Sequence, residues 1–473
     1  MTHIDFKAEV AARKEDLLAD LFSLLKINSE RDDSQATPET PFGPGPVAAL
    51  QQFLSLAERD GYATKNVDNY AGHFTYGDDL PEDAEVLGIF AHMDVVPAGT
   101  GWDSNPYEPE IRDGKIYARG ASDDKGPTMA CYYGLKILKE LNVPLTKKIR
   151  FIAGTDEESG WGDMDYYFAH VGLPEPDFGF SPDAEFPIIN GEKGNITEYL
   201  HIAGDNNTGT VHLHSFTGGL RENMVPESAT AVISGDLADL NAKLEAFVSA
   251  HSDKNLRFET EATSDGQVTV VLHGRSAHGA MPEKGVNGAT YLAKFLDKIG
   301  VVSPFTKIAG TILIEDHAGD KTGVAFEDPK MGALSMNAGV FNFDDASSDN
   351  TIALNFRYPQ GTDSDAIYSV LAALEGVDAV TKSAHEHTPH YVPMDDELVS
   401  KLLSVYEKQT GLKGHEQIIG GGTFGRLLKR GVAFGAMFPG DIDTMHQANE
   451  FIPVDVLLRA AAIYAEAIYE LAK

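Results

Sequence analysis

The stretch IFAHMDVVP, from Ile89 to Pro97, decides how the rest of this sequence is interpreted. The apolar run Val86–Phe90 that leads into it is too short for a helix and predicts a buried strand. Pro97 prevents that strand from continuing. His92 and Asp94 therefore fall at the carboxyl end of a strand, where open α/β sheets bind their ligands. A carboxylate two residues away can orient the imidazole, as carboxylates do for metal-bound histidines.

The composition narrows the class of protein. A chain of 473 residues is too long for one ordinary core and predicts two or three domains. The 38 Lys and Arg against 72 Asp and Glu give a net charge of −34, which opposes binding to nucleic acid or anionic membranes. No apolar stretch approaches the roughly 20 residues of a membrane span, and the first residues lack a signal-peptide pattern. Cys131 is the only cysteine, so any metal must be held by His, Asp and Glu. We expect a cytoplasmic protein.

The order of the expected elements predicts an α/β fold with a large insertion. Alternating helices and strands before residue 190 indicate a mostly parallel sheet flanked by helices. Residues 191–389 have an α+β pattern, and the α/β pattern returns afterwards. We therefore expect a catalytic domain from 1–190 and 390–473, interrupted by a lid domain from 191–389 that grips the substrate. Helices are expected at 6–26, 47–59, 127–141, 237–250, 287–299, 363–375, 396–410 and 454–472, and strands at 86–90, 148–154, 211–216, 229–235, 267–272, 307–315 and 351–356.

Two of the four stretches that add metal-ligand chemistry contain adjacent acids. ASDDKGP places Asp123 and Asp124 just before a predicted helix, where a helix N-cap is the alternative role. GTDEESGW places Glu157 and Glu158 directly after a buried strand. Adjacent side chains on an extended backbone point apart, so one glutamate can bind metal while the other faces a water molecule. A solvated acidic turn is the alternative for this pair.

The other two stretches complete the donor set. Asp183 in FSPDAEFP lies in a loop after an apolar segment, and His446 in GDIDTMHQANE is a second imidazole just before the last helix. Two imidazoles with three or four carboxylates suit two zinc ions bridged by a carboxylate and a water molecule. A spare carboxylate is needed to take a proton from that water, and Glu157 beside Glu158 provides one.

These motifs together resemble the di-zinc metallopeptidase family that includes carnosinases, aminoacylase, succinyl-diaminopimelate desuccinylase and bacterial carboxypeptidase G. The resemblance spans nearly the whole chain, through HMDVVPAGTGWDSNPYEP, ARGASDDKGP, GTDEESG, PDAEFP, GRSAHGAMPEKGVNG and MHQANE. The longer segments HMDVVPAGTGWDSNPYEP and PDAEFPIINGEKG are most similar to the bacterial dipeptidase V branch, which is Xaa-His dipeptidase-like.

The resemblance implies a role for each residue of the metal centre. One zinc ion would be held by His92, Asp123 and Asp183, and the other by Asp123, Glu158 and His446. A hydroxide bridging the two ions would attack the peptide carbonyl, with Glu157 as general base and Asp94 orienting His92. Manganese or cobalt could occupy the same ligands.

The resemblance also extends to the insert. His278 in GRSAHGAMPEKG would stabilise the oxyanion that forms during hydrolysis. Asn223 and Arg357 look like substrate-gripping residues, and an arginine suits bidentate capture of a C-terminal carboxylate. Gly422 and Thr423 in IGGGTFGR resemble a loop whose backbone meets the same carboxylate.

The leading hypothesis is a metal-dependent dipeptidase that cleaves unblocked dipeptides, with β-Ala or D-Ala at the N-terminus as further candidates. An N-acyl amino acid hydrolase or exocarboxypeptidase of the same family is the alternative, and a non-catalytic peptide-binding relative is a distant one. The insert is large enough for its second half to replace a partner subunit, so we expect a monomer to be functional.

Several other histidines are not expected to take part in this chemistry. His212 and His214 alternate on a predicted strand and are expected to line one face of a sheet. His385, His387 and His390 lie among turn residues at the expected domain boundary, where a surface or linker position is favoured.

Overall fold

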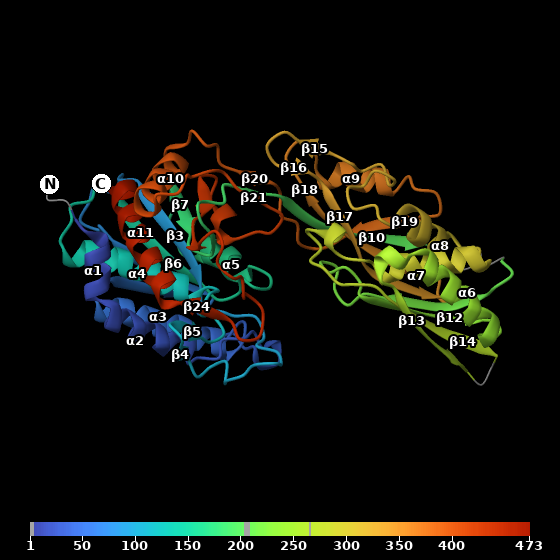
Figure 1. Ribbon diagram of the computed structural model, residues 1–473. Helices are drawn as coiled ribbons and strands as arrows, with labels where there is room; N and C mark the ends of the chain where they lie inside the picture. Colours follow the sequence, from blue (N-terminus) through green and yellow to red (C-terminus); the bar gives the residue numbers. More distant parts are fainter. Residues whose placement is uncertain (1–3, 203–208, 264–265) are drawn as a thin grey trace. The chain divides into compact units, whose positions relative to one another are not determined.

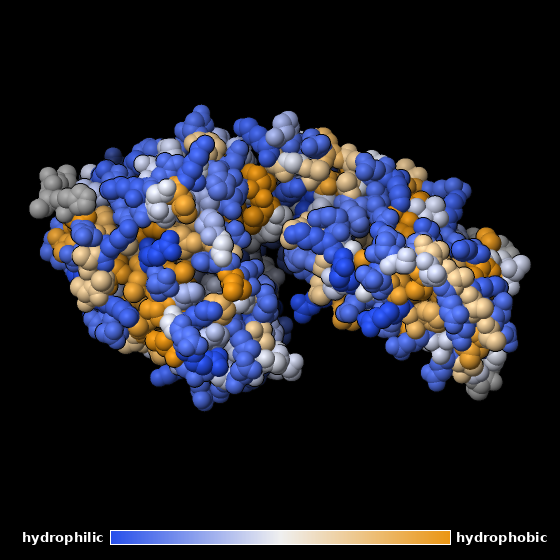
Figure 2. All heavy atoms as spheres, in the orientation of Figure 1, coloured by the Kyte–Doolittle hydropathy of each residue, from blue (hydrophilic) through white to orange (hydrophobic). Residues whose placement is uncertain are grey.

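The computed structural model describes residues 4–202, 209–263 and 266–473 (Figure 1). The chain divides into two compact units: unit 1 comprises Met1–Gly191 and Tyr391–Lys473, and unit 2 comprises Glu192–His390. Each unit has its own hydrophobic core. On the face shown in Figure 2, hydrophilic side chains cover most of each unit and hydrophobic ones are scattered among them. No helix in these described ranges is long and apolar enough to cross a membrane.

Unit 1 is built on a six-stranded sheet with helices on both faces. The strand order is β1-β2-β6-β3-β7-β22, and the three pairings β6/β3, β3/β7 and β7/β22 are parallel, whereas β1/β2 and β2/β6 are antiparallel. The fold is therefore the predicted α/β type with a mostly parallel sheet. The strands are β1 Ala63–Val67, β2 Ala71–Tyr76, β3 Val86–His92, β6 Lys148–Gly154, β7 Phe178–Ser181 and β22 Gly431–Ala433.

The helices of unit 1 are α1 Phe6–Ala12, α2 Lys14–Leu25, α3 Pro44–Arg59, α4 Lys125–Glu140, α5 Gly162–His170, α10 Glu397–Thr410 and α11 Val454–Ala472. Its short elements are η1 Asp33–Gln35, β4 Glu110–Arg112, β5 Lys115–Tyr117, β8 Ala184–Glu185, β21 Ile418–Ile419, η5 Phe424–Leu427, β23 Ala436–Met437 and β24 Phe451–Pro453. Two short strands, β9 Gly191–Glu192 and β20 His390–Tyr391, lie where the chain passes from one unit to the other.

The alternation of side chains along β3 explains why both faces of this sheet are covered. Ile89 and Ala91 point into the large core that contains α4 and α11, whereas Phe90 points into the smaller core beneath α5. Helices α4 and α11 pack closely (Figure 1), because Gly134 lacks a Cβ that would lie 2.8 Å from the backbone nitrogen of Ala465. A strand buried on both faces is nearly continuously apolar, as the sequence of β3 is.

Unit 2 contains an eight-stranded antiparallel sheet in the order β13-β14-β12-β11-β17-β18-β10-β19. Its strands are β10 Gly194–Ile202, β11 Leu213–Gly218, β12 Ser228–Ser234, β13 Arg257–Ala262, β14 Gln267–His273, β17 Ser335–Asp344, β18 Asn350–Tyr358 and β19 Ala379–Lys382. The other elements are α6 Leu237–Ala250, η2 Ser252–Lys254, η3 Pro282–Lys284, α7 Gly288–Ile299, α8 Pro304–Lys307, η4 Ile308–Ile312, β15 Glu327–Asp328, β16 Gly332–Ala333 and α9 Ser364–Leu371. Alternate residues of β12 are buried, so one face of the sheet packs on the helices.

The order of elements divides this sheet into two halves of four strands that meet at β11 and β17. In one half, the antiparallel pair β11/β12 is followed by helix α6 and the edge strand β13. In the other, the pair β17/β18 is followed by helix α9 and the edge strand β19. The two halves therefore repeat the same arrangement of strands and helix.

The predicted strand at 307–315 is wrong. This segment continues α8 as a turn of π-helix, η4, between Ile308 and Ile312. Ser303 caps the helix by accepting a hydrogen bond from the backbone N–H of Phe305, and Pro304 suits the first helical turn. Gly310 then packs against helix α7, where a Cβ would lie 2.4 Å from the backbone nitrogen of Lys294. A short apolar run does not distinguish a buried strand from a buried helix, and here close packing against α7 favours the helix.

The predicted helix at 6–26 is interrupted. It forms two helices, α1 and α2, because Arg13 has φ −111° and ψ 10°, outside the helical range. Helices α3 and α4 begin at Pro44 and Lys125, earlier than predicted.

Candidate metal centre

The candidate centre forms where β3 and β6 end side by side in unit 1. The register pairs His92, the last residue of β3, with Gly154, the last residue of β6, and the N–H of Met93 donates to the Gly154 carbonyl at 2.9 Å. Parallel pairing therefore brings His92 together with Glu157 and Glu158, which follow β6. This is the edge of the sheet where the carboxyl ends of parallel strands create a binding site.

Two groups of donors meet at the carboxylate of Asp123. In the first group, the Nε2 atom of His92 lies 3.0 Å from Asp123 Oδ1 and 3.6 Å from Asp183 Oδ2. In the second, the Nε2 atom of His446 lies 2.9 Å from Asp123 Oδ2 and 3.2 Å from Glu158 Oε2. Each group has three donor atoms within 4.8 Å of one another. Asp123 thus offers one oxygen to each group, as a bridging ligand would.

The chemistry of these residues fits divalent metal ions. Imidazole nitrogen and carboxylate oxygen are the donors that zinc, manganese and cobalt accept. Among the described residues, the buried Oε1 atom of Glu158 has no hydrogen-bond partner, an arrangement that costs free energy unless a cation lies nearby. Burial and, to a smaller extent, the charge of Asp123 raise the pKa of Glu158 to about 7. The same two causes raise the pKa of Asp183. Hydrogen bonds to Asp123 and Glu158 raise the pKa of His446 to about 11.

Asp94 has two structural roles, of which the sequence indicated one. Its Oδ1 atom lies 3.3 Å from Nδ1 of His92, and its carbonyl oxygen lies 3.1 Å from the same nitrogen, so Nε2 of that ring faces the donor group. In addition, the backbone N–H groups of Glu157 and Glu158 donate to Oδ1 and Oδ2 of Asp94 at 3.2 and 3.1 Å. One carboxylate therefore holds the imidazole and the pair of glutamates in place together.

The segment after β6 is a turn rather than the extended backbone assumed from the sequence. The N–H groups of Thr155 and Asp156 donate to Oδ2 of Asp163 at 2.6 and 2.9 Å. With the two bonds to Asp94, every N–H from residue 155 to 158 meets a carboxylate. Two buried aspartates therefore determine where the glutamates point, and Asp163 was not predicted from the sequence.

Glu450 is a second functional residue that the sequence analysis did not assign. It is fully buried and accepts hydrogen bonds from Nη1 of Arg119 at 2.6 Å and from the N–H groups of Ser122 and Asp123 at 2.8 and 3.2 Å. These contacts fix the backbone that presents the Asp123 side chain. The sequence signal was its position at the end of MHQANE, four residues after His446.

The GGT loop lies beside the centre in unit 1. Thr423 caps the short helix η5 by accepting a hydrogen bond from the N–H of Gly425 at 3.0 Å. The next residue, Phe424, packs edge-on against His92 with 6.4 Å between ring centroids. This contact places Gly422 and Thr423 next to an imidazole of the candidate centre.

The three candidate residues of the insert belong to connected segments of unit 2. The N–H of Gly279, next to His278, donates to the carbonyl of Asn223 at 2.7 Å. Arg357 on β18 is paired with Ser335 on β17, whose hydroxyl donates to the carbonyl of Ala280 at 3.3 Å. Strand β17 therefore connects the segment that carries Arg357 to the loop that carries His278.

The acids of the centre differ in how the protein satisfies them. Asp94, Asp163 and Glu450 each accept two or more backbone hydrogen bonds. In contrast, the carboxylate oxygens of Asp123 and Glu158 lie next to imidazole nitrogens of His92 and His446. Asp94, Asp163 and Glu450 therefore hold the backbone, whereas Asp123 and Glu158 face the imidazoles.

Comparison with known proteins identifies relatives along nearly the whole chain. Residues 88–470 match the model of the family described as Peptidase family M20/M25/M40. The Beta-Ala-Xaa dipeptidase of Lactobacillus delbrueckii subsp. lactis is 45% identical over 475 residues, which cover 99% of each chain.

Two solved structures share the fold. Human carnosine dipeptidase 1 gives a TM-score of 0.55 at 15% identity, covering 98% of both chains. The aminoacylhistidine dipeptidase of Vibrio alginolyticus gives a TM-score of 0.56 at 16% identity, covering 97% of this chain and 96% of the other. At these identities the likeness concerns the fold alone.

Replacing Glu450 with Gln should destabilise unit 1 strongly. The change leaves the buried guanidinium of Arg119 without its counter-charge, and breaking a buried ion pair from one side costs about 3–5 kcal/mol. Urea unfolding followed by circular dichroism measures the loss. The matched control is Glu85→Gln, which removes an exposed carboxylate from its ion pair with Lys147, a kind of pair worth about 0–1 kcal/mol at a protein surface. Similar losses in the two variants would contradict the role assigned to Glu450.

Proposed function

The chain belongs to peptidase family M20/M25/M40, and from that premise we propose that it hydrolyses unblocked dipeptides at a two-metal centre in unit 1. The observation that carries the proposal is the carboxylate of Asp123, whose two oxygens lie 3.0 and 2.9 Å from imidazole nitrogens of two separate donor groups. The dipeptidase name of a relative that is 45% identical over 99% of both chains supports the substrate class. Metal-dependent dipeptidase activity is therefore the function assigned to this chain.

We assign His92, Asp123 and Asp183 to one metal ion, and Asp123, Glu158 and His446 to the other. Zinc is the proposed metal because each group combines one imidazole with carboxylates, although manganese and cobalt accept the same donors. The charges also fit, since three ligand carboxylates leave two divalent cations with one positive charge to be balanced by hydroxide. When bound, the two ions would polarise the scissile carbonyl and lower the pKa of the attacking water.

Glu157 is the proposed general base. Burial, with the charges of Asp183 and Glu158 contributing, raises its pKa well above the ordinary value for a glutamate. A carboxylate whose pKa is closer to neutral is better suited to accept a proton from water and return it to the leaving amine. The hydrogen bond from its own N–H to Asp94 holds the backbone at this position.

Residues of unit 2 are proposed to bind the substrate. Arg357 would grip the C-terminal carboxylate, Asn223 would contribute a further polar contact, and His278 would stabilise the oxyanion. In unit 1, the backbone at Gly422 and Thr423 would meet the same carboxylate. We propose that unit 2 acts as a lid over the catalytic unit 1.

We further propose that one chain works alone in the cytoplasm. The two-half sheet of unit 2 supports a monomer, because a single chain then provides both the segment that carries His278 and a second, similar half. A single cysteine supports a reducing compartment. Light scattering during size-exclusion chromatography should give a mass close to 51.1 kDa. An obligate dimer in which His278→Ala is complemented by a second inactive variant would contradict this.

The purified, zinc-loaded chain should hydrolyse Ala-Ala and β-Ala-His, and it should leave N-acetyl amino acids and tripeptides intact. Glu157→Gln should reduce kcat about 10²–10⁴-fold, because it removes the proton acceptor. Its bound zinc, counted by atomic absorption, should match that of the wild type. A chelator should abolish hydrolysis, and adding back zinc, manganese or cobalt identifies the functional metal.

The panel also separates the alternatives. Cleavage of the N-acetyl compound alone would replace the dipeptidase assignment with an N-acyl amino acid hydrolase. Metal binding without hydrolysis of any compound would indicate a peptide-binding relative. Full activity of the Glu157→Gln variant would rule out this residue as the base.

Arg357→Lys should raise KM for dipeptides about 10–100-fold with a smaller change in kcat. Lysine keeps the charge but loses the bidentate geometry, and charged hydrogen bonds contribute about 1.5–3 kcal/mol. The control is Arg257→Lys on the edge strand β13, where the side chain is exposed. A dipeptide with an amidated C-terminus should bind the wild type and Arg357→Lys equally. If Arg357→Lys weakened binding of the amidated dipeptide as much as binding of the free acid, Arg357 would have another role.

A further inference from the structure

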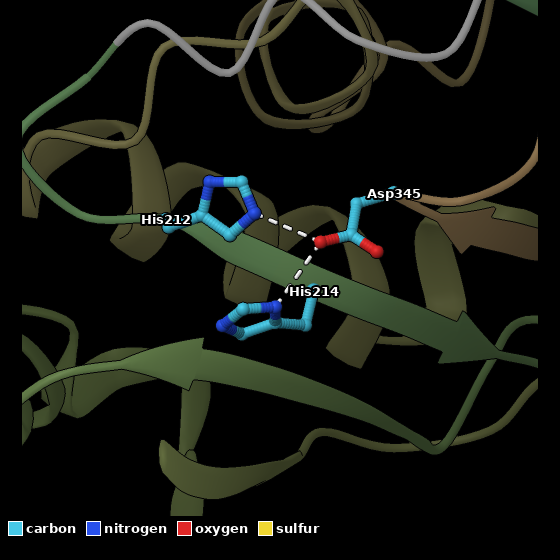
Figure 3. A group of neighbouring side chains, drawn as sticks. All are labelled: His212, His214 and Asp345. Carbon is cyan, nitrogen blue, oxygen red and sulfur yellow. Dashed lines mark hydrogen bonds and ion pairs between the residues drawn. The ribbon is translucent and has the colours of Figure 1, made fainter. Parts of the chain in front are cut away.

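A second type of donor cluster lies in unit 2, outside the candidate centre of unit 1. It consists of His212 and His214, at the start of β11, and Asp345, which directly follows β17 (Figure 3). The strands β11 and β17 are antiparallel neighbours, with Ser215 opposite Asp344. The cluster therefore joins the two strands at which the halves of the sheet meet.

Both imidazole rings point at the same carboxylate oxygen (Figure 3). The Nε2 atom of His212 lies 2.8 Å from Oδ2 of Asp345, and the Nδ1 atom of His214 lies 3.1 Å from it. The ring centroids are 4.5 Å apart with an interplanar angle of 63°. The three donor atoms lie within 4.8 Å of one another. Two imidazole nitrogens and one carboxylate oxygen form the donor set of many transition-metal sites.

The backbone holds the three side chains in this arrangement. The register of β11 with β12 shifts between Leu213 and Ser215, so His214 is the extra residue of a bulge, a feature that redirects side chains. Leu213 between the histidines is fully buried in the core, which keeps both rings on the opposite side. The carbonyl of His214 accepts a hydrogen bond from the N–H of Asp345 at 2.9 Å.

The contact between His214 and Ser234 uses the ring nitrogen that points away from Asp345. Its Nε2 atom lies 2.9 Å from the hydroxyl oxygen of Ser234 on β12. The carbonyl of His212 accepts a hydrogen bond from the N–H of the same serine at 2.9 Å. Metal-bound histidines usually make such a contact through the nitrogen that does not bind the metal, which fixes the tautomer.

A structural ion pair is the alternative role, and a nearby pair shows what one looks like. His201 has its Nδ1 atom 2.7 Å from Asp349 and its Nε2 atom 2.8 Å from the hydroxyl of Thr381, so a single ring meets that carboxylate. In the cluster, two rings converge on one oxygen instead.

We propose that His212, His214 and Asp345 bind one divalent transition-metal ion, with zinc as the representative ion and water in the remaining positions. The side chains are 44, 26 and 32% exposed, so solvent reaches the site and can supply both the ion and the water ligands. The ion would connect the start of β11 to the turn after β17 and so link the two halves of the sheet. An ion that binds only the folded state stabilises it. This inference is independent of the function proposed for unit 1.

Equilibrium dialysis of the full chain against Zn²⁺ at pH 8 tests the proposal. His212→Ala should bind one Zn²⁺ fewer per chain than the wild type. Asp345→Asn, which keeps the size of the side chain but removes its charge, should lose the same equivalent. The matched control is His201→Ala, which removes the neighbouring His–Asp pair and should bind as much Zn²⁺ as the wild type.

Two further readouts separate the site from a general effect on folding. Far-UV circular dichroism of both variants should match that of the wild type. Dipeptide hydrolysis should also be unchanged, because none of these residues contributes to the centre in unit 1. Equal Zn²⁺ binding by the wild type, His212→Ala and Asp345→Asn would overturn the proposal and leave the cluster as a hydrogen-bonded ion pair.

Discussion

The candidate centre depends on buried carboxylates that accept hydrogen bonds from the backbone. Asp94 and Asp163 bind the four successive N–H groups after β6, and Glu450 binds those before α4. A loop at the end of a strand has backbone donors that no neighbouring strand satisfies, and burying them unpaired is costly. Carboxylates that meet this need also fix the direction of Asp123 and Glu158. The geometry of the centre is therefore set by Asp94, Asp163 and Glu450, which hold the backbone that carries the donor residues.

The sequence predicted most of the fold where one signal dominated. Strand β6 and helices α6 and α11 have the predicted bounds, because long periodic patterns or flanking turn residues mark their ends. The prediction was wrong at η4, where the apolar run 307–315 has no period that separates strand from helix. Its conformation depends on close packing against α7, a tertiary contact that the local sequence does not contain.

The candidate site was predictable to the extent that its residues follow buried strands. His92 and Glu158 could be placed at one edge of the sheet from strand order alone, and the register of β3 with β6 brings their segments together. Glu450 and Asp163 could not be found this way, because their importance lies in which backbone groups they meet. An acid that accepts N–H groups and an acid that faces imidazoles have the same signature in a sequence. Only the hydrogen-bond partners tell them apart.

The same criterion applies to the histidines of unit 2. The i, i+2 spacing of His212 and His214 predicted that both line one face of a sheet, with no part in metal chemistry. What changes the interpretation is Asp345, which is 131 residues from His214 in sequence and is brought beside it by the pairing of β11 with β17. A pair of histidines on a strand has few geometric constraints by itself. A third donor that directly follows a neighbouring strand, with the carbonyls of His212 and His214 already hydrogen-bonded, gives the cluster the fixed geometry that metal binding requires.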